Sequence, residues 1–352
     1  MKFDLHKILR PHIIDLVPYS SARDEYTGKE GVFLDANENP YQSVNGQHWN
    51  RYPDPYQWAI KEKLAPIKGV RPTQIFLGNG SDEPIDLLVR ATCTPQLDNM
   101  IIMPPTYGMY QVSADINNVA VKKAPLTPDF QIDTNKVLEA ITPHTKLIWI
   151  CSPNNPSGNL VQSEDIMAIL DGFDGLVIVD EAYIDFASAT SFTTKLNQYP
   201  NLIVLQTFSK AWGLASLRLG MCFASEEIIS VLNKIKPPYN LSGATQAILL
   251  DALAYIEDKN LLVEKILAER ERLITQLSVL PIVKHIYPSD ANFLLVKFEN
   301  AKAIFDDLIQ RKIIVRDRSK VLLCDDCLRI TIGTSEENKT LIEALKNQNG
   351  SS

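Results

Sequence analysis

The chain has 352 residues, a formal net charge of −7 and 45% hydrophobic residues. This length predicts a large domain with a smaller one, and the acidic charge argues against a nucleic-acid-binding surface. No apolar run approaches the roughly 20 residues that span a bilayer, so we expect no membrane partner. Five scattered cysteines and the lack of a signal-peptide pattern predict a reducing, cytoplasmic setting.

Three segments follow one another along the chain. Residues 1–30 are polar and broken by prolines, and we interpret them as an N-terminal arm that belongs to the small domain. Over residues 31–245, short β-rich runs alternate with helical or turn-rich stretches, which predicts a mostly parallel sheet between helices. Residues 246–352 contain linking helices and then an α+β small domain, with strands expected at 293–298, 312–315 and 328–333. The expected fold class is therefore α/β.

The segment GNGSDEPIDLLVRA (78–91) is the first along the chain whose residues suggest a binding site. Two glycines are followed by Ser81, Asp82 and a helical pattern with Pro84 in its first turn. Free N–H groups and the dipole at such a helix start can bind a phosphate group. Helix capping alone would also explain Ser81 and Asp82.

Two very apolar strand patterns end in polar side chains. KLIWICSPNNPSG (146–158) places Asn155 in a turn after its strand, and LVIVDEAYIDF (176–186) places Asp180 at the strand end with Tyr183 three residues later. Ligands of open α/β sheets bind at the carboxyl ends of strands, where a carboxylate can pair with a protonated ring nitrogen. Turn formation remains an alternative for the first segment, and a cap or metal ligand for Asp180.

The segment TFSKAWGLASLRLG (207–220) places Ser209, Lys210 and Arg218 around a short turn after a buried strand. A partly buried lysine has a lowered pKa and can form a Schiff base, while the hydroxyl and guanidinium groups suit a phosphate. An ordinary surface lysine is the alternative interpretation of Lys210 taken alone.

Together these segments resemble the fold-type I aminotransferases, which use pyridoxal 5′-phosphate (PLP), and within them the histidinol-phosphate aminotransferase family. The resemblance covers roughly residues 10–345 and implies a seven-stranded, mostly parallel sheet in a PLP-binding large domain. Its tags are LDANENPY (34–41), RYPDP (51–55), GNGSDE (78–83), PPTYGMY (104–110), SPNNPSG (152–158), VDEAY (179–183), FSKAWGLASLRLG (208–220) and LRITIGT (328–334).

The resemblance also implies roles for the residues that bind PLP. Lys210 would form the Schiff base and move a proton between substrate and cofactor, and Asp180 would hold the ring nitrogen. Tyr183 and Asn155 would bind the ring's 3′-oxygen, and Tyr107 would lie against the ring. The cofactor phosphate would be bound by Gly80, Ser81, Asp82, Ser209 and Arg218, with Tyr52 reaching it from a neighbouring subunit. We therefore expect a homodimer with shared active sites.

The expected reaction is transamination of L-histidinol phosphate with 2-oxoglutarate, which gives imidazole-acetol phosphate and L-glutamate. Arg329 matches the family's carboxylate-binding arginine. Arg316 is our choice for the substrate phosphate, with Tyr19 and Asn79 as helpers, and Arg318 remains open as its alternative.

Other readings of the same motifs are a PLP-dependent threonine-phosphate decarboxylase and an aromatic amino acid aminotransferase. A catalytically silent PLP-fold protein is disfavoured because Lys210, Asp180 and Arg218 are all present. We expect no metal site, because the pair Cys324 and Cys327 lacks a second ligand pair and the five histidines lack metal-ligand spacing.

Overall fold

A seven-stranded sheet forms the centre of the large domain in the computed structural model, which describes residues 3–19 and 31–346. The strands lie in the order β1-β7-β6-β5-β4-β2-β3, and β7 alone runs antiparallel to both of its neighbours. The mostly parallel seven-stranded sheet is thus confirmed. The strands are β1 (Ile75–Asn79), β2 (Asn99–Ile102), β3 (Ala120–Lys123), β4 (Thr145–Cys151), β5 (Leu176–Asp180), β6 (Leu202–Thr207) and β7 (Leu219–Phe223).

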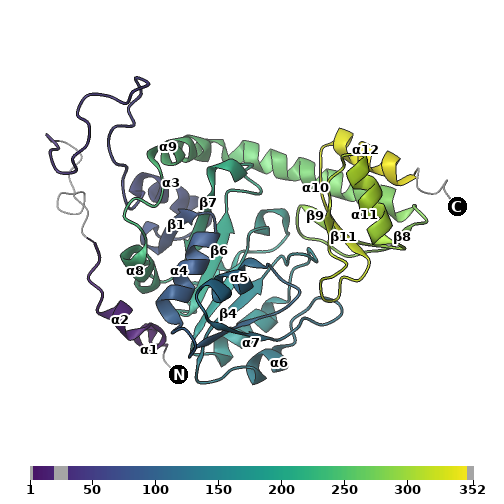
Figure 1. Cartoon of the computed structure of the whole chain (residues 1–352), viewed down its shortest axis with the longest axis horizontal. Coiled ribbons are helices and arrows are strands. Elements are labelled where there is room, and N and C mark those ends of the chain that lie inside the picture. Colours follow the sequence, from purple (N-terminus) through teal and green to yellow (C-terminus); the bar gives the residue numbers. More distant parts are fainter. Residues whose placement is uncertain (1–2, 20–30, 347–352) are drawn as a thin grey trace.

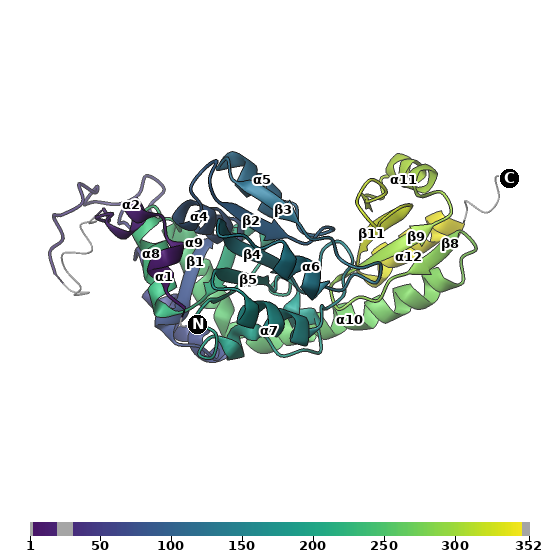
Figure 2. The same cartoon turned by 90° about the horizontal axis from the view of Figure 1, so that it is seen from below.

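Helices cover both faces of this sheet, as Figures 1 and 2 show. Alternate side chains of each central strand enter two separate apolar cores, which explains why the strands are apolar throughout. One core receives α3 (Trp58–Lys68), α6 (Thr134–Glu139), α7 (Ser163–Gly172) and α9 (Gly243–Ala252). The other receives α4 (Asp82–Thr92), α5 (Met109–Ile116) and α8 (Glu226–Ile235).

The small domain contains a four-stranded antiparallel sheet in the order β10-β11-β9-β8. Its core gathers side chains from the sheet and from the helices packed on it. The strand expected at 312–315 is wrong: Lys312 has a left-handed φ of 61°, and the paired segment begins only at Arg316. The elements are β8 (Val283–Ile286), β9 (Phe293–Phe298), α11 (Ala301–Gln310), β10 (Arg316–Asp317), β11 (Cys327–Thr331) and α12 (Ser335–Lys346).

The N-terminal arm begins with the short helices α1 (Leu5–Ile8) and α2 (Pro11–Ile14). Leu5, Ile8 and Leu9 are buried in the large-domain core that contains α4. This position differs from the expectation that the arm belongs to the small domain; residues 20–30 of the arm lie outside the described residues. Apolar spacing predicts that such a helix buries one face, but it does not identify the core that receives it.

The long helix α10 (Ile256–Ser278) joins the two domains (Figure 1). The domain boundary expected at residue 245 falls within α9, whose Leu249 is buried in the large-domain core. Near its start, Lys259 of α10 forms a 3.0 Å ion pair with Asp185, and the two side chains are only 11% and 16% exposed. Among the described residues, no helix is both long and apolar enough to cross a membrane.

We expect Lys259→Met to lower the free energy of unfolding by about 2 kcal/mol, because it leaves Asp185 largely buried without its partner. Urea denaturation followed by circular dichroism measures this loss. The matched control is Lys302→Met, which removes the exposed pair with Asp306 on α11 and should change stability by less than about 0.5 kcal/mol. Equal effects of the two substitutions would show that the α10 pair adds nothing beyond a surface contact.

Candidate active site

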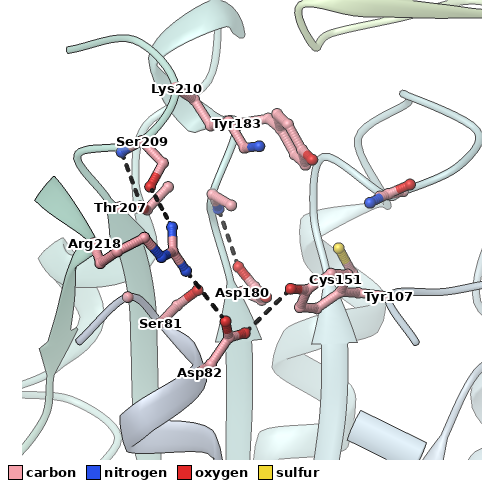
Figure 3. Close-up of a pocket in the computed structure, with 13 residues that line it drawn as sticks. Ser81, Asp82, Tyr107, Cys151, Asp180, Tyr183, Thr207, Ser209, Lys210 and Arg218 are labelled. Atoms are coloured by element: carbon pink, nitrogen blue, oxygen red, sulfur yellow. Dashed lines mark hydrogen bonds and ion pairs between the residues drawn. The ribbon is translucent and has the colours of Figure 1, made fainter. Parts of the chain in front are cut away.

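A cavity opens at the carboxyl ends of β4, β5 and β6, where parallel strands present their last residues at one edge (Figure 3). Most of the residues expected to bind a cofactor lie around it although they come from five separate segments. Those that line it are Gly80, Ser81, Asp82, Tyr107, Asn155, Asp180, Tyr183, Ser209, Lys210 and Arg218.

One end of the cavity is a cradle of backbone N–H groups and polar side chains. Gly80 has a left-handed φ of 69°, which turns the chain from β1 into the first turn of α4, and its N–H donates to the Arg218 carbonyl over 2.7 Å. The Arg218 guanidinium lies 3.4 Å from Asp82 Oδ2 and 3.4 Å from Ser209 Oγ. The Arg218 guanidinium, the Ser209 hydroxyl and the N–H groups at the start of α4 are donors suited to a phosphate group.

The opposite part of the cavity contains the carboxylate of Asp180, which is 2% exposed. Its Oδ2 accepts a 2.7 Å hydrogen bond from the Tyr110 hydroxyl, and its Oδ1 accepts one of 3.1 Å from the Ala182 N–H. Burial raises the pKa of Asp180 to about 6, and the hydrogen bond from Tyr110 is the largest influence in the opposite direction. A protonated ring nitrogen would supply the missing positive partner.

Lys210 lines the cavity beside Tyr183, with its Nζ 5.6 Å from the centre of the Tyr183 ring (Figure 3). Although part of its side chain faces solvent, desolvation lowers the pKa of its amine, and the charges of Arg329 and Arg218 lower it further. The shift increases the fraction of neutral amine, which is the form that attacks a carbonyl and accepts a proton.

Arg329 reaches the cavity through Asn155, because its guanidinium donates a 2.5 Å hydrogen bond to Asn155 Oδ1. The guanidinium also lies 5.2 Å from the centre of the Phe293 ring. Arg329 belongs to β11 of the small domain, whereas Asn155 follows β4 of the large one. The contact therefore joins the two domains at the edge of the cavity.

Besides Arg329, four predicted residues lie away from the cavity lining. Tyr52 is 51% exposed and stacks on Tyr239, with ring centres 4.5 Å apart. Asn79 donates to the Asn240 carbonyl, and Tyr19, which belongs to the arm, is 75% exposed. Arg316 is exposed at the edge of the small-domain sheet. Within one chain, these side chains do not meet the cofactor-binding groups.

The comparisons with known proteins agree with this geometry. The family model for class I and II aminotransferases matches residues 25–345. A histidinol-phosphate aminotransferase of Cytophaga hutchinsonii is 56% identical over 346 residues, which cover 98% of this chain and 99% of that protein. The chain belongs to the histidinol-phosphate aminotransferase family.

Solved structures support the same fold. The histidinol-phosphate aminotransferase of Clostridium acetobutylicum aligns with a TM-score of 0.79 over 86% of this chain and 92% of that one, at 24% identity. The enzyme of Sinorhizobium meliloti, solved in complex with pyridoxal-5′-phosphate, aligns with a TM-score of 0.77 over 84% and 82%, at 25% identity. The fold is that of the fold-type I PLP-dependent aminotransferases.

The cofactor of this aminotransferase family is PLP, and the cavity has the groups that PLP requires. The cradle of Ser81, Ser209 and Arg218 offers donors to a phosphate, while Asp180 is a buried acceptor without a cationic partner in hydrogen-bond contact among the described residues. Lys210 lines the same cavity, as a covalent link to the cofactor aldehyde requires. Among the described residues, no cluster of three or more potential metal ligands was found.

Three side chains of this aminotransferase site were missed in the sequence. Cys151 and Thr207 line the cavity at the ends of β4 and β6. Thr207 Oγ1 accepts a hydrogen bond from the Ser209 N–H and so shapes the turn before Lys210. Tyr110 lies behind the cavity and contacts Asp180. Thr207 could have been found from its place at the end of a predicted strand, but Tyr110 belongs to a helix that gives no such signal.

The cofactor-free aminotransferase should be stabilised at neutral pH by Asp180→Asn. Because the folded-state pKa of Asp180, about 6, is above its ordinary value of 3.8, stability is lost as the pH rises from about 4 to 6 and stays lost above 6. Removing this group should raise the free energy of unfolding by about 2 to 3 kcal/mol at pH 7. Urea denaturation of both proteins at pH 4 and pH 7 measures this change in the free energy of unfolding. A difference between the proteins that is as large at pH 4 as at pH 7 would contradict the explanation.

Proposed function

We propose that the protein transfers an amino group from L-histidinol phosphate to 2-oxoglutarate, forming imidazole-acetol phosphate and L-glutamate in histidine biosynthesis. The reaction needs a single site that binds a phosphate-bearing amine first and a dicarboxylate afterwards. The observation that carries the proposal is a group of three arginines on the small-domain sheet, Arg316, Arg318 and Arg329, of which Arg329 contacts Asn155 in the cavity lining. No ion pair with a carboxylate was found for these three among the described residues.

The register of the small-domain strands supports this assignment. Arg316 lies directly opposite Arg329 in the β10–β11 pair, so both side chains start from the same face of the sheet. Their neighbours on the other face include Leu328, which is buried in the small-domain core. Desolvation lowers the pKa of Arg318, with the charges of Arg329 and Arg316 adding to the effect, so three positive charges gather at one place. Anions of both substrates fit such a surface.

In this reaction Lys210 would move a proton to and from the α-carbon of the substrate, since its amine is partly desolvated and enters the cavity. PLP, when bound, accepts the amino group and draws electron density away from that carbon. Asp180 would keep the ring nitrogen protonated by pairing with it. Tyr183 and Asn155 would orient the ring through its 3′-oxygen, and Tyr107 would lie against its face.

Single arginine substitutions should separate the two half-reactions. Arg316→Ala should raise the KM for histidinol phosphate about 30-fold and leave the KM for glutamate within about twofold, since one charge-assisted contact to the phosphate is lost. Arg318→Ala is the matched control on the same strand edge. Steady-state kinetics with each substrate gives both values. If Arg318→Ala has the larger effect, the phosphate assignment moves to Arg318.

Absorbance spectroscopy tests the proposed substrates directly. Histidinol phosphate added to the PLP-loaded protein should convert the lysine-bound form of the cofactor to its amine form, and 2-oxoglutarate should restore it. Phenylalanine in place of histidinol phosphate should leave the spectrum unchanged over the same time. Conversion by phenylalanine alone would favour an aromatic amino acid aminotransferase, and carbon dioxide release from threonine phosphate would favour a decarboxylase.

We also propose that two copies of the chain share their active sites. Support comes from the segment around residues 32–58, which exposes several large apolar side chains. They are Val32, Leu34, Tyr41, Val44, Trp49, Tyr52 and Trp58. Exposed apolar groups of this number are typical of protein interfaces. A mixture of the variants Lys210→Ala and Tyr52→Ala should regain activity if Tyr52 acts in the neighbouring site, because one hybrid site then has both residues.

A cytoplasmic setting is supported by five buried free cysteines.

A further inference from the structure

The hydroxyl of Tyr110 is the one side-chain donor in hydrogen-bond contact with Asp180 among the described residues. Tyr110 lies on α5, 70 residues from Asp180 in sequence, and its side chain is fully buried. The 2.7 Å distance from its hydroxyl oxygen to Asp180 Oδ2 is ordinary for a hydrogen bond between a hydroxyl donor and an oxygen acceptor. Because the hydroxyl donates, the contact favours the ionised form of this carboxylate.

The ring of Tyr110 is held in place on two sides. It stacks on Trp149 of β4 with ring centres 4.9 Å apart and planes 18° from parallel. The ring of Tyr107 meets it edge-on at 5.6 Å. Trp149 is fully buried in the central strand β4, and Tyr110 is itself fully buried, so the Tyr110 ring packs in the interior of the large domain.

Through Tyr107 this arrangement extends to the phosphate cradle. The Tyr107 hydroxyl donates to Asp82 Oδ1 over 3.1 Å, and Asp82 Oδ2 lies 3.4 Å from the Arg218 guanidinium (Figure 3). A continuous series of contacts thus runs from Asp180 through Tyr110, Tyr107 and Asp82 to Arg218. It fixes the distance between the carboxylate at one end of the cavity and the cradle at the other.

We propose that Tyr110 is a positioning residue that orients the Asp180 carboxylate toward the ring nitrogen of PLP. Asp180 has one donor on each oxygen, Tyr110 on Oδ2 and the Ala182 N–H on Oδ1. With the Oδ2 donor removed, the carboxylate would be free to rotate or to take up a proton, because a buried charge without donors is costly. Either change weakens its pairing with a ring nitrogen. The inference rests on the role given to Asp180 in the proposed function.

A merely structural role for Tyr110 is the competing explanation, since its ring also fills the core between α5 and β4. The two explanations differ in what they predict for a cofactor analogue. An analogue of PLP with a C–H group in place of the ring nitrogen cannot pair with Asp180, yet it has the same shape and phosphate. A packing defect should weaken the binding of PLP and of the analogue equally. A misplaced Asp180 should weaken the binding of PLP alone.

The experiment measures the dissociation constants of PLP and of this analogue for the cofactor-free, full-length protein by fluorescence titration. Tyr110→Phe should weaken PLP binding about tenfold, the effect of one charge-assisted hydrogen bond, and change binding of the analogue by less than about twofold. Trp149→Phe is the packing control, because it loosens the stack under Tyr110 without removing a hydrogen bond to Asp180, and it should leave the ratio of the two constants unchanged.

The outcomes separate this inference from the assignment of Asp180. Asp180→Asn should abolish the preference for PLP over the analogue. If it does, and Tyr110→Phe leaves the ratio at the wild-type value, Tyr110 only fills space and the inference is overturned. If Asp180→Asn itself leaves the ratio unchanged, Asp180 is not the partner of the ring nitrogen, and the proposed role of Asp180 falls together with the inference.

Discussion

Lys210→Ala should lower kcat for transamination by about 10⁴-fold, because it removes the group that moves the proton as well as the covalent link to the cofactor. Lys210 lines the cavity together with Asp180 and Arg218, and among the residues that the structure describes it is the only lysine in this lining. Rapid measurement of glutamate formation with purified, PLP-supplemented protein determines the loss. The visible absorbance band of the lysine-bound cofactor should disappear in the same sample.

Lys195→Ala is the matched control for this experiment, since Lys195 lies on the turn before β6 and does not line the cavity. It should retain wild-type activity and the wild-type absorbance band. If the Lys210→Ala protein folds, keeps the absorbance band of the lysine-bound cofactor and still forms glutamate, the reactive amine belongs to another residue.

Gly220→Ala should weaken PLP binding by about 100-fold. A methyl group at residue 220 would lie 2.2 Å from the Gly80 carbonyl carbon and 2.2 Å from the Ser81 nitrogen, both backbone atoms that cannot rotate away. Relief of this overlap must displace the loop before α4, at a cost of about 1 to 3 kcal/mol, and the displaced N–H groups would no longer converge on a phosphate. Titration of the cofactor-free protein with PLP measures the affinity.

Gly108→Ala provides the corresponding control at the start of α5. A methyl group there would meet no atom within 4 Å, and its φ of −67° is accessible to alanine. PLP affinity should be unchanged in this variant. An equal loss of affinity in both variants would mean that the close approach of β7 to the loop is not what shapes the cradle.

The fold of the large domain and the lining of the cavity were largely predictable from the sequence, for a simple geometric reason. Asn155, Asp180 and Ser209 each follow an apolar strand pattern, and the ends of neighbouring parallel strands meet at one edge. Local chain direction is enough to bring such residues together. The glycine loop before α4 is equally local, since its two glycines and the helix start are adjacent in sequence.

Contacts that depend on tertiary packing were not predictable in this way. Tyr110 faces Asp180 because α5 packs on β4 in one particular rotation, and no spacing in the sequence encodes that rotation. The placement of α1 is a similar case, since it depends on which apolar surface is available nearby. Tyr19 was expected at the active site, yet its side chain lies outside the cavity. Tyr52 was expected at the site of a neighbouring subunit, and its place outside the cavity of its own chain leaves that expectation a prediction.

The buried Asp180 carboxylate has a consequence for how long the protein persists in a cell. Without cofactor the charge lacks a cation in contact, so the folded state opens more often and is more accessible to proteases. A bound ligand that supplies the cation stabilises the folded state by mass action. The steady-state amount of the protein should then follow the supply of vitamin B6, even at a constant rate of synthesis.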